Sequence, residues 1–368
     1  MNKVDLLEVY LNGSSVGRIA LTPEGLAAFE YDPEWIKNGH SISPYYLPLK
    51  PGLMIAKRDP FRGNFGVFDD SLPDGWGNLL FDRFLQEKGI NPYKLNVLER
   101  LSLIGSTGRG ALEYRPDRSL ATDDERLDFD KLAAESQKLL ASSTATDSLD
   151  ELYRYGGSSG GARPKVFTKI DGREWLVKFK ASTDPSTVGQ TEYNYSLLAK
   201  ACGIKMPETR LFEGKYFGVE RFDRTAAGKI HTVSAAGLLH ADYRIPSLDY
   251  SLLLKLTLQL TKDMEQVADM YRLMVFNAAI SNRDDHAKNF SFQYCNGSWR
   301  LSPAYDLLPS NGFNGYHTTT IGGKGEPTRA NMLALANEVG LQKQRAETIV
   351  EEIKIKIKSS TPSTCLLL

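Results

Sequence analysis

The stretch ISNRDDHAKNFSF, residues 280–292, gathers two aspartates, a histidine, a lysine and two asparagines between apolar segments. Within it, Asp284 and Asn289 have the spacing D-x-x-x-x-N, which in protein kinases supplies a catalytic aspartate and a metal-binding asparagine from one loop. The next residues, FSFQYCNGSWRL, predict a β-hairpin with an Asn-Gly turn, and Asp306 lies beyond it. Because a hairpin returns the chain to its starting edge, we expect the Asp306 carboxylate beside the Asn289 amide. Oxygen ligands of this kind suit Mg²⁺, so the stretch predicts a catalytic aspartate next to a magnesium site.

A glycine-rich loop and a strand lysine precede this stretch. Lys178 is the interior charge of the apolar strand EWLVKFK, and we expect it to reach the α- and β-phosphates of a nucleotide. Glu192, on the following predicted helix, is a candidate ion-pair partner for Lys178. The loop GGSSGGARPK contains four glycines whose backbone N–H groups are able to approach phosphate oxygens closely; these are Gly156, Gly157, Gly160 and Gly161.

Each of these features has a structural alternative. The loop matches neither G-x-G-x-x-G nor G-x-x-x-x-G-K-[ST], Lys178 is able to snorkel from a strand edge, and Asp284 or Asp285 is able to cap the preceding helix. We interpret His286 as a structural hydrogen-bonding residue, because the adjacent Asp285 and His286 side chains diverge and no second histidine has ligand spacing. The order of the parts favours catalysis: glycine loop, strand lysine, helix glutamate, D-x-x-x-x-N, hairpin and aspartate follow one another as a kinase requires.

The rest of the chain divides into a strand-rich half and a helix-rich half. Turn dipeptides between β-branched segments predict hairpins, and apolar residues at helical spacing predict helices. The predicted hairpins cover 6–21, 166–180 and 290–301; a further strand covers 216–222; the helices cover 78–88, 129–140, 191–201, 248–260 and 264–280; and a Ser/Thr-rich linker covers 141–148. The fold class is therefore α+β.

Composition narrows the class of protein further. With 368 residues, of which 41% are hydrophobic and 24% charged, the chain is long enough for two lobes and has no signature of disorder. Lys+Arg and Asp+Glu both number 45, so there is no basic excess that would favour direct nucleic-acid binding. Three scattered cysteines and the absence of a long apolar run predict a cytoplasmic protein with no membrane partner.

Together these motifs resemble the HipA family of bacterial serine/threonine kinases, the toxins of HipA/HipB toxin–antitoxin modules. The resemblance rests on SLPDGWG (71–77), SSGGARPK (158–165), VERFDR (219–224), SNRDDHAKNFSF (281–292) and SPAYDLLPS (302–310). It implies a two-lobed, protein-kinase-like fold with a strand-rich N-terminal lobe and a mainly helical C-terminal lobe. The implied parts are an N-terminal subdomain over 1–115, a kinase N-lobe with glycine loop and hinge over 116–224, and a helical C-lobe over 225–368.

The resemblance also assigns roles to single residues. Asp284 corresponds to the family's catalytic aspartate, Asn289 and Asp306 to its magnesium ligands, and Lys178 to its nucleotide-phosphate lysine. Ser158 corresponds to a serine whose autophosphorylation ejects the glycine loop, and Ser159 shares or replaces that role. The expected ATP contacts are Gly160, Gly161, Ala162, Lys178, Glu220 through its backbone, Phe222 by apolar packing, and Lys288.

The implied activity is that of an ATP- and Mg²⁺-dependent serine/threonine protein kinase and toxin. Its implied partners are a HipB-like helix-turn-helix antitoxin, through which it would meet DNA indirectly, and a protein substrate such as an aminoacyl-tRNA synthetase. A catalytically silent subunit that supports a repressor is the alternative. A metal-dependent hydrolase that uses Asp284, Asp285 and His286 is disfavoured, because water activation gives no reason for the glycine loop. The last residues, SSTPSTCLLL, are interpreted as a tail whose CLLL ending matches the C-a-a-X pattern without an expectation of lipidation.

Overall fold

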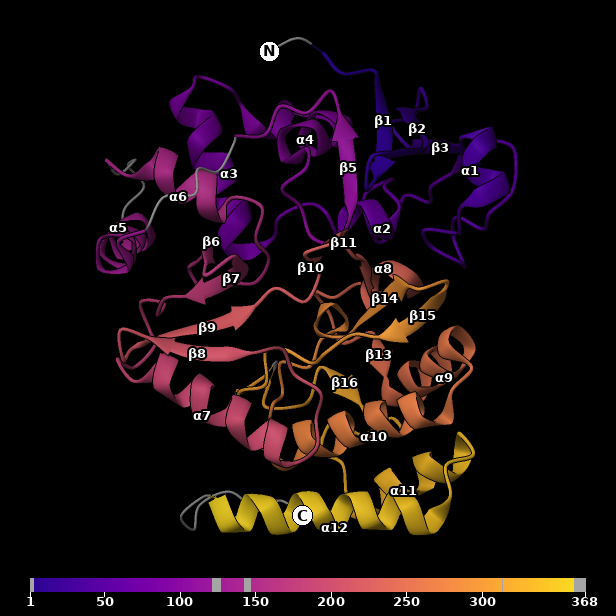
Figure 1. Ribbon diagram of the computed structural model, residues 1–368, viewed down its shortest axis with the longest axis vertical. Helices are drawn as coiled ribbons and strands as arrows, with labels where there is room; N and C mark the ends of the chain where they lie inside the picture. The colour runs from indigo at the N-terminus through magenta and orange to yellow at the C-terminus, as the bar shows by residue number, and fades with distance from the viewer. Residues whose placement is uncertain (1–2, 121–126, 142–146, 313, 361–368) are drawn as a thin grey trace. The chain divides into compact units, whose positions relative to one another are not determined.

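The computed structural model describes residues 3–120, 127–141, 147–312 and 314–360. The chain divides into two compact units, and Figure 1 labels their helices and strands. The first unit consists of residues 1–190 and 209–233, and the second of residues 191–208 and 234–368. The predicted linker at 141–148 and the predicted tail at 359–368 fall largely outside the described residues. Ser359 and Ser360 are described, and they belong to the last helix among the described residues and not to a tail.

The first unit begins with an antiparallel sheet of order β4-β3-β2-β1-β5. Asn12 and Gly13 join its first two strands with φ of 47° and 83°, which confirms the predicted Asn-Gly hairpin. The strands are β1 (Leu6–Leu11), β2 (Ser14–Leu21), β3 (Ala27–Tyr31), β4 (Met54–Ile55) and β5 (Leu112–Arg115). The helices in this region are α1 (Pro33–Asn38), α2 (Gly66–Asp69), α3 (Gly75–Glu87), η1 (Pro92–Lys94) and α4 (Val97–Ile104).

A second antiparallel sheet of the first unit, of order β6-β7-β9-β8, carries the predicted glycine loop and strand lysine. Its first hairpin turns at Asp171 and Gly172, both at positive φ, as the sequence predicts. The strands are β6 (Lys165–Ile170), β7 (Arg173–Lys178), β8 (Thr209–Phe212) and β9 (Tyr216–Glu220). Two helices precede the sheet, α5 (Phe129–Ala141) and α6 (Leu149–Gly156), and three short strands follow it, β10 (Arg224–Thr225), β11 (Gly228–Lys229) and β12 (His231–Ser234).

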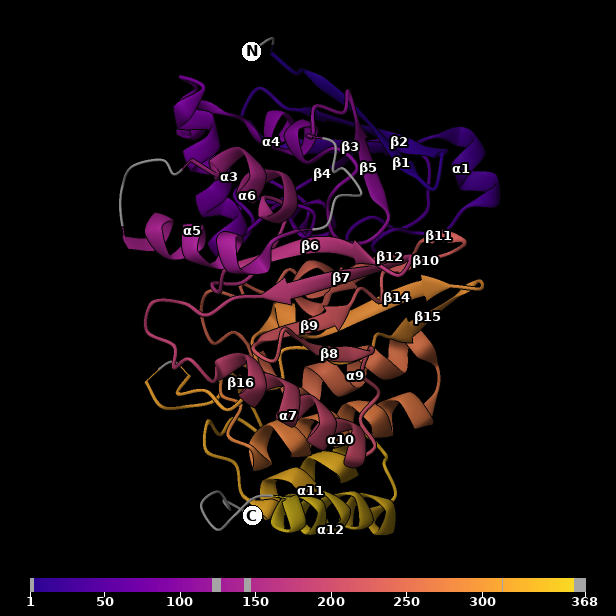
Figure 2. The ribbon, with the colours of Figure 1, turned by 60° about the vertical axis from the view of Figure 1, so that its left-hand side comes forward.

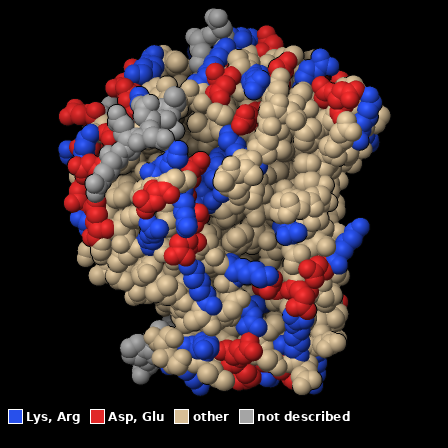
Figure 3. All heavy atoms as spheres, viewed as in Figure 1, with Lys and Arg blue, Asp and Glu red and all other residues tan. Residues whose placement is uncertain are grey.

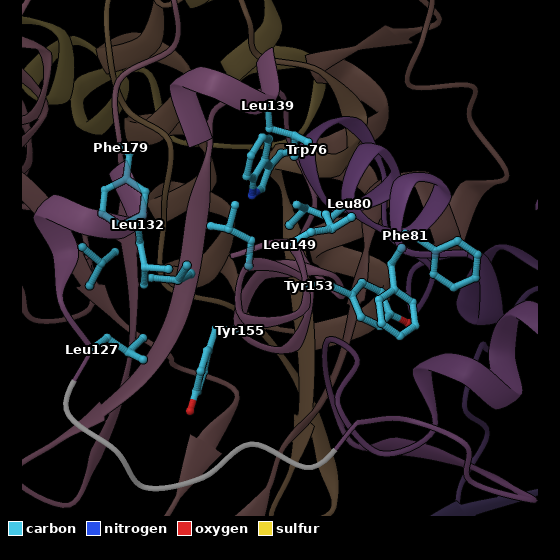
Figure 4. Close-up of a cluster of buried hydrophobic side chains, with 14 of the residues drawn as sticks. Trp76, Leu80, Phe81, Leu127, Leu132, Leu139, Leu149, Tyr153, Tyr155 and Phe179 are labelled. Atoms are coloured by element: carbon cyan, nitrogen blue, oxygen red, sulfur yellow. The ribbon is translucent and has the colours of Figure 1, made fainter. Parts of the chain in front are cut away.

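One hydrophobic core joins this second sheet to α3. Helix α6 packs on both β6 and α3 (Figure 2). The core includes Trp76 and Leu80 from α3 and Tyr153 from α6, together with Val166 and Trp175 from the sheet. Figure 4 shows several of these side chains converging from the helices. The core therefore crosses the predicted boundary at residue 115; the three-part division of the chain stays a prediction.

Two neighbouring histidines of the first unit predict how its stability depends on pH. His231 is buried, with Nε2 2.8 Å from the carbonyl of Ile42, and its ring lies 5.8 Å from that of His40. Burial lowers the pKa of His231 from 6.5 to about 4. The pKa of His40 falls to about 3, first because the ring is buried and second because His231 lies close to it. The unfolded chain therefore binds protons at a higher pH than the folded chain does.

The free energy of unfolding should be highest above pH 6.5 and fall as the pH drops toward 4. The expected slope is about 1.4 kcal/mol per pH unit for each histidine. In urea titrations, His231→Gln should make the loss of stability between pH 7 and pH 5 smaller by about 2 kcal/mol. An identical pH dependence in parent and variant would contradict this account.

The second unit is mainly helical, and its central helix is α10 (Met264–Ala279). Asp263 caps this helix by accepting from the N–H of Glu265 at 2.9 Å. Helix α10 is buried along most of its length and packs against α9 and α12 (Figure 1). The other helices are α7 (Val188–Ala201, mostly in this unit), α8 (Ala235–Leu239), α9 (Tyr250–Thr261), η2 (Ala287–Asn289), α11 (Arg329–Glu338) and α12 (Lys343–Ser360).

Four strands complete the described part of the second unit. β14 (Ser291–Cys295) and β15 (Ser298–Leu301) form an antiparallel hairpin, while β13 (Leu248–Asp249) and β16 (Thr319–Thr320) form a short parallel pair. The β14–β15 turn holds Asn296 and Gly297 at φ of 51° and 77°, so this predicted hairpin is also confirmed. Among the described residues, no helix is long and apolar enough to cross a bilayer. On the face drawn in Figure 3, basic and acidic side chains are interspersed, in keeping with the absence of net charge.

Candidate active site

The D-x-x-x-x-N segment is a tight loop that starts where α10 ends. Ile280 is the C-cap of α10, and Ser281 then adopts a left-handed conformation with φ of 56°. Asn289 closes the loop, because its Nδ2 donates to the backbone oxygen of Asp284 at 2.7 Å. This bond engages the amide nitrogen of Asn289, so the carbonyl oxygen of the same side chain is the atom that would ligate a metal ion. Asp284 is exposed, as a residue that receives a substrate hydroxyl must be.

Hydrogen bonds hold the Asp306 segment against this loop. The backbone oxygen of Asp306 accepts from Asn282 Nδ2 at 3.1 Å, and the N–H of Asp284 donates to Ser310 Oγ at 2.8 Å. The Tyr305 hydroxyl donates to the backbone oxygen of Lys288 at 2.6 Å. The structure therefore brings the segments of Asp284, Asn289 and Asp306 together within one unit.

A buried polar network underlies the same loop. The Asp285 side chain is 1% exposed and accepts from the Tyr250 hydroxyl at 3.0 Å and from the N–H of Thr319 at 3.1 Å. His317 Nδ1 lies 2.9 Å from the same carboxylate and is the donor, since an ionised carboxylate only accepts. Burial first, and then the Asp285 charge, raise the pKa of Tyr250 well above 10, so the hydroxyl remains a donor. Three donors therefore hold the Asp285 carboxylate, and with it the backbone of the D-x-x-x-x-N loop.

The network also reaches Asp306. Tyr250 accepts from Asn277 Nδ2 at 3.0 Å, Asn277 Oδ1 accepts from Asn282 Nδ2 at 3.1 Å, and Asn282 also donates to Asp306. Chains of buried hydrogen bonds reinforce one another in a low dielectric. Asp285 and Asp306 are therefore connected through side chains from α9, α10 and the loop. Sequence reasoning missed this role of Tyr250, Asn277 and His317, because no local pattern marks a partner that lies some thirty residues away.

The buried position of Asp285 argues against the alternative that the protein is a metal-dependent hydrolase. Activation of water by Asp285 and His286 would require both side chains at one accessible point. The Asp285 carboxylate is instead enclosed, and His286 Nδ1 accepts from the backbone N–H of Lys288 at 3.2 Å. His286 thus has the structural hydrogen bond that its sequence context predicts.

The oxygen atoms at this loop fit a magnesium ion. Asn289 contributes an amide oxygen that its own hydrogen bond orients, and Asp306, at φ of 55°, contributes a carboxylate from the adjoining segment. Mg²⁺ binds few protein oxygens and completes its coordination with water and nucleotide phosphates. Among the described residues, no three His, Cys, Asp or Glu side chains form a metal cluster. Asn289 and Asp306 would hold the ion.

The glycine loop is shorter than the sequence predicts. Gly156 is the last residue of α6 and Gly157 is its C-cap, so neither belongs to the loop proper. Gly160, Gly161 and Ala162 are the exposed part of the loop, and Gly161 has φ of 81°. Lys165, at the start of β6, donates its ammonium to the carbonyl of Gly160.

The two serines of the loop differ in their surroundings. Ser159 is 1% exposed, and its hydroxyl donates to the carbonyl of Gly156 at 2.6 Å. Ser158 is half-buried, and its hydroxyl donates to the carbonyl of Thr107 at 3.1 Å. The structure thus distinguishes two positions that the sequence leaves equivalent.

The remaining predicted nucleotide contacts lie at the end of β7, at and just after the end of β9, where Phe222 follows two residues beyond Glu220, and in the D-x-x-x-x-N loop. Lys178 ends β7 with its Nζ 5.6 Å from the ring centroid of Phe217. The Glu220 side chain pairs with Arg173 at 3.4 Å, which is consistent with a ligand contact through the Glu220 backbone. Lys288 is buried with its Nζ 4.1 Å from the centre of the Tyr243 ring.

A buried ionic cluster follows β9 in the predicted hinge. Asp223 Oδ2 lies 2.8 Å from Arg221 and 3.0 Å from Arg224, and it accepts from the N–H of Gly110 at 2.8 Å. Burial alone would raise the pKa of Asp223, but the two arginine charges outweigh it and hold this pKa well below its usual range. Both arginines also donate to the carbonyl of Gly108. The hinge is therefore fastened to the loop that precedes β5, which sequence reasoning missed because the resemblance gives the motif VERFDR only ATP contacts, through Glu220 and Phe222.

Lys178, Glu220 and Phe222 belong to the first unit, whereas Asp284, Lys288, Asn289 and Asp306 belong to the second. Glu192 also belongs to the second unit, and it is buried on α7. Convergence of Lys178 with the carboxylates, its pairing with Glu192 and the assigned roles of these residues stay predictions.

Comparison with known protein families gives two matches along the chain. Residues 7–115 match the HipA N-terminal domain, and residues 157–361 match the HipA-like C-terminal domain. Two curated relatives come from Sinorhizobium fredii. The one named "Putative kinase Y4dM" is 25% identical over 335 residues, covering 84% of this chain and 78% of the relative, and "Putative kinase Y4mE" is 27% identical over 344 residues, covering 83% and 77%.

A solved structure has the same fold. The structure described as the Shewanella oneidensis MR-1 toxin–antitoxin system HipA, HipB and its operator DNA complex aligns with 96% of this chain and 89% of its own, with a TM-score of 0.71 and 17% identity. At this identity the likeness establishes the fold alone. The predicted HipA-like α+β fold is thereby confirmed.

Proposed function

Because this chain belongs to the HipA family, we propose that it is an ATP- and Mg²⁺-dependent serine/threonine protein kinase and the toxin of a toxin–antitoxin module. The observation that carries the proposal is the loop in which Asn289 donates to the Asp284 backbone while Asn282 holds the Asp306 segment beside it. Kinases need this combination of one exposed aspartate and two metal-binding oxygens, because phosphoryl transfer depends chiefly on positioning and charge stabilisation. The kinase names of the Sinorhizobium relatives support the same activity.

In this proposal each residue has a separate task. Asp284 orients the substrate hydroxyl and accepts its proton, and Lys178 stabilises the phosphate charge. Asn289 and Asp306 hold Mg²⁺, which when bound neutralises charge on the transferred phosphate. The buried Asp285 touches no substrate; it keeps the backbone of the loop in place.

We further propose that autophosphorylation occurs on Ser158 and not on Ser159. The Ser159 hydroxyl is enclosed and donates to Gly156 at the end of α6, whereas Ser158 is partly accessible. A phosphate on Ser158 would replace a hydroxyl donor with an anionic group facing the carbonyl of Thr107. It would add about −1.5 to −2 charge to a loop that must also hold the phosphates of ATP, so nucleotide binding should weaken.

The test is incubation with radiolabelled ATP and Mg²⁺, followed by mapping of the labelled peptide. The parent should incorporate phosphate on Ser158, Ser158→Ala should lose this label, and Ser159→Ala should retain it. Equal labelling of Ser158→Ala and the parent would contradict the assignment. ATP binding without any transfer, to itself or to candidate synthetases, would instead favour the silent subunit that supports a repressor.

The proposed partners follow from family membership and from charge. The related Shewanella structure contains HipA with HipB and operator DNA, and we propose a HipB-like helix-turn-helix antitoxin for this chain. Its equal numbers of basic and acidic residues suit a protein that meets DNA only through such a partner. A protein such as an aminoacyl-tRNA synthetase is the proposed substrate.

A further inference from the structure

Asp74, in the motif SLPDGWG, contacts the glycine loop and does not cap its own helix. It occupies the N-cap position of α3, where an aspartate normally accepts from the first free N–H groups of the helix, yet it makes no such bond. Its carboxylate accepts instead from the backbone N–H of Gly161. Since a capping bond contributes about 1 kcal/mol, directing this side chain to Gly161 forgoes local stability.

A second hydrogen bond comes from the same segment. The backbone N–H of Trp76 donates to the carbonyl of Gly161 at 2.8 Å, so both backbone polar groups of Gly161 are bound by residues of one short segment. The Trp76 ring lies in the hydrophobic core between α3 and α6, and its Nε1 donates to the carbonyl of Lys165 at 3.2 Å (Figure 4). The segment that holds Gly161 is therefore itself firmly anchored.

The glycines of the motif allow this close approach. A Cβ on Gly75 would overlap the carbonyl oxygen of Gly161, and one on Gly77 would overlap that of Ser159. Gly75 and Gly161 both have positive φ, at 44° and 81°. Backbone therefore packs directly on backbone, an arrangement that glycine alone permits.

The charges near the loop indicate what the contact does. A carboxylate beside a loop that receives a triphosphate repels the anion, so its presence there calls for a compensating charge and a separate structural role. The buried Lys165, which donates to the carbonyl of Gly160, offsets this charge. If Asp74 merely competed with phosphate, the contact would involve only the N–H of Gly161. Here the backbone N–H of Trp76 also binds the Gly161 carbonyl.

We propose that Asp74 is a positioning residue that, with the Trp76 backbone, fixes Gly161 and so shapes the glycine loop for the phosphates of ATP. This gives the N-terminal domain a part in nucleotide binding. Because the Gly161 N–H donates to Asp74, the phosphates of ATP would be bound by neighbouring N–H groups of the loop. The inference rests on the proposed kinase function for its consequence, but the contact itself is testable without nucleotide.

The first measurement is hydrogen exchange at the Gly161 amide of the full chain without ATP. Asp74→Ala should accelerate this exchange by about tenfold or more, because a hydrogen bond to a charged acceptor is lost. Asp74→Asn retains an acceptor oxygen and should stay within about threefold of the parent. Glu87→Ala removes an exposed carboxylate from the other end of α3 and serves as the control. Unchanged exchange in Asp74→Ala would overturn the proposal.

The second measurement is the affinity for ATP and the rate of transfer. Asp74→Ala should raise the Kd and KM for ATP about tenfold with kcat within about twofold, and Asp74→Asn should restore most of the affinity. Tighter ATP binding by Asp74→Ala would show that the carboxylate competes with phosphate, which overturns positioning. A parent that binds no ATP overturns the proposed function instead, while the exchange experiment still decides whether Asp74 holds the loop.

Discussion

Replacing Asp284 by asparagine should lower the rate of phosphoryl transfer by about 10²–10⁴-fold, because the variant keeps the shape of the side chain but lacks a base for the substrate hydroxyl. The side chain is exposed, and the backbone N–H and carbonyl of the residue bond to Ser310 and Asn289, contacts that asparagine at this position retains. The thermal midpoint and the Kd for ATP should therefore stay close to the parent values. Radiolabel transfer, isothermal titration and a thermal melt measure the three quantities.

Glu338→Gln is the control for this variant. Glu338 is the last residue of α11, is half-exposed and pairs with Lys255 at 2.6 Å, so the change removes a carboxylate from a surface ion pair. Such pairs contribute little to stability, and transfer should be unaffected. Transfer by Asp284→Asn at a rate near the parental one would remove Asp284 from the proposed chemistry. It would leave the fold assignment intact, since that rests on the family and structural matches.

Replacing Asp285 by alanine should cost about 3 kcal/mol in the free energy of unfolding of the second unit. The change leaves Tyr250, His317 and the Thr319 N–H buried without their shared acceptor, and unmet buried donors are costly. Because the same network reaches Asp306, phosphoryl transfer should fall as well, even under conditions in which the protein remains folded. Urea titration followed by circular dichroism measures the first effect and radiolabel transfer the second.

Tyr250→Phe separates this network from general packing. It removes one hydroxyl donor and keeps the ring, so it should cost about 1 kcal/mol, clearly less than Asp285→Ala. If Asp285→Ala were as stable as the parent, the buried hydrogen bonds would not be what holds the D-x-x-x-x-N loop. Full stability together with lost transfer would assign Asp285 to the chemistry itself.

The local structure around the candidate site follows from short sequence patterns. Asn12-Gly13, Asp171-Gly172 and Asn296-Gly297 adopt the positive φ values that two-residue hairpins need, and few other residues tolerate them. The helical spacing over 264–280 corresponds to α10 almost residue for residue. The sequence predicts these elements because their conformations depend on interactions between residues that are close together along the chain.

Other features depended on partners that are distant in the sequence. In the five-stranded sheet, β1 pairs with β5, which lies about a hundred residues further along the chain. No turn pattern in the sequence predicts this pairing. Gly156 and Gly157 looked like part of the phosphate loop, but α6 continues to Gly156 because its apolar side packs on α3 and β6. A glycine is weak as a helix stop when tertiary packing stabilises the helix around it.

By itself, the sequence determined the family and the order of the candidate reactive groups, because the spacing and one hairpin single out Asp284, Asn289 and Asp306. Only the tertiary structure decided what holds them, namely that Asp285 rests on Tyr250 and His317, and that Asp74 reaches Gly161 and leaves its own helix uncapped. The physical reason is that reactive residues are conspicuous by chemical type. Their supports are ordinary polar residues, and it is burial beside a partner far along the chain that makes their hydrogen bonds strong.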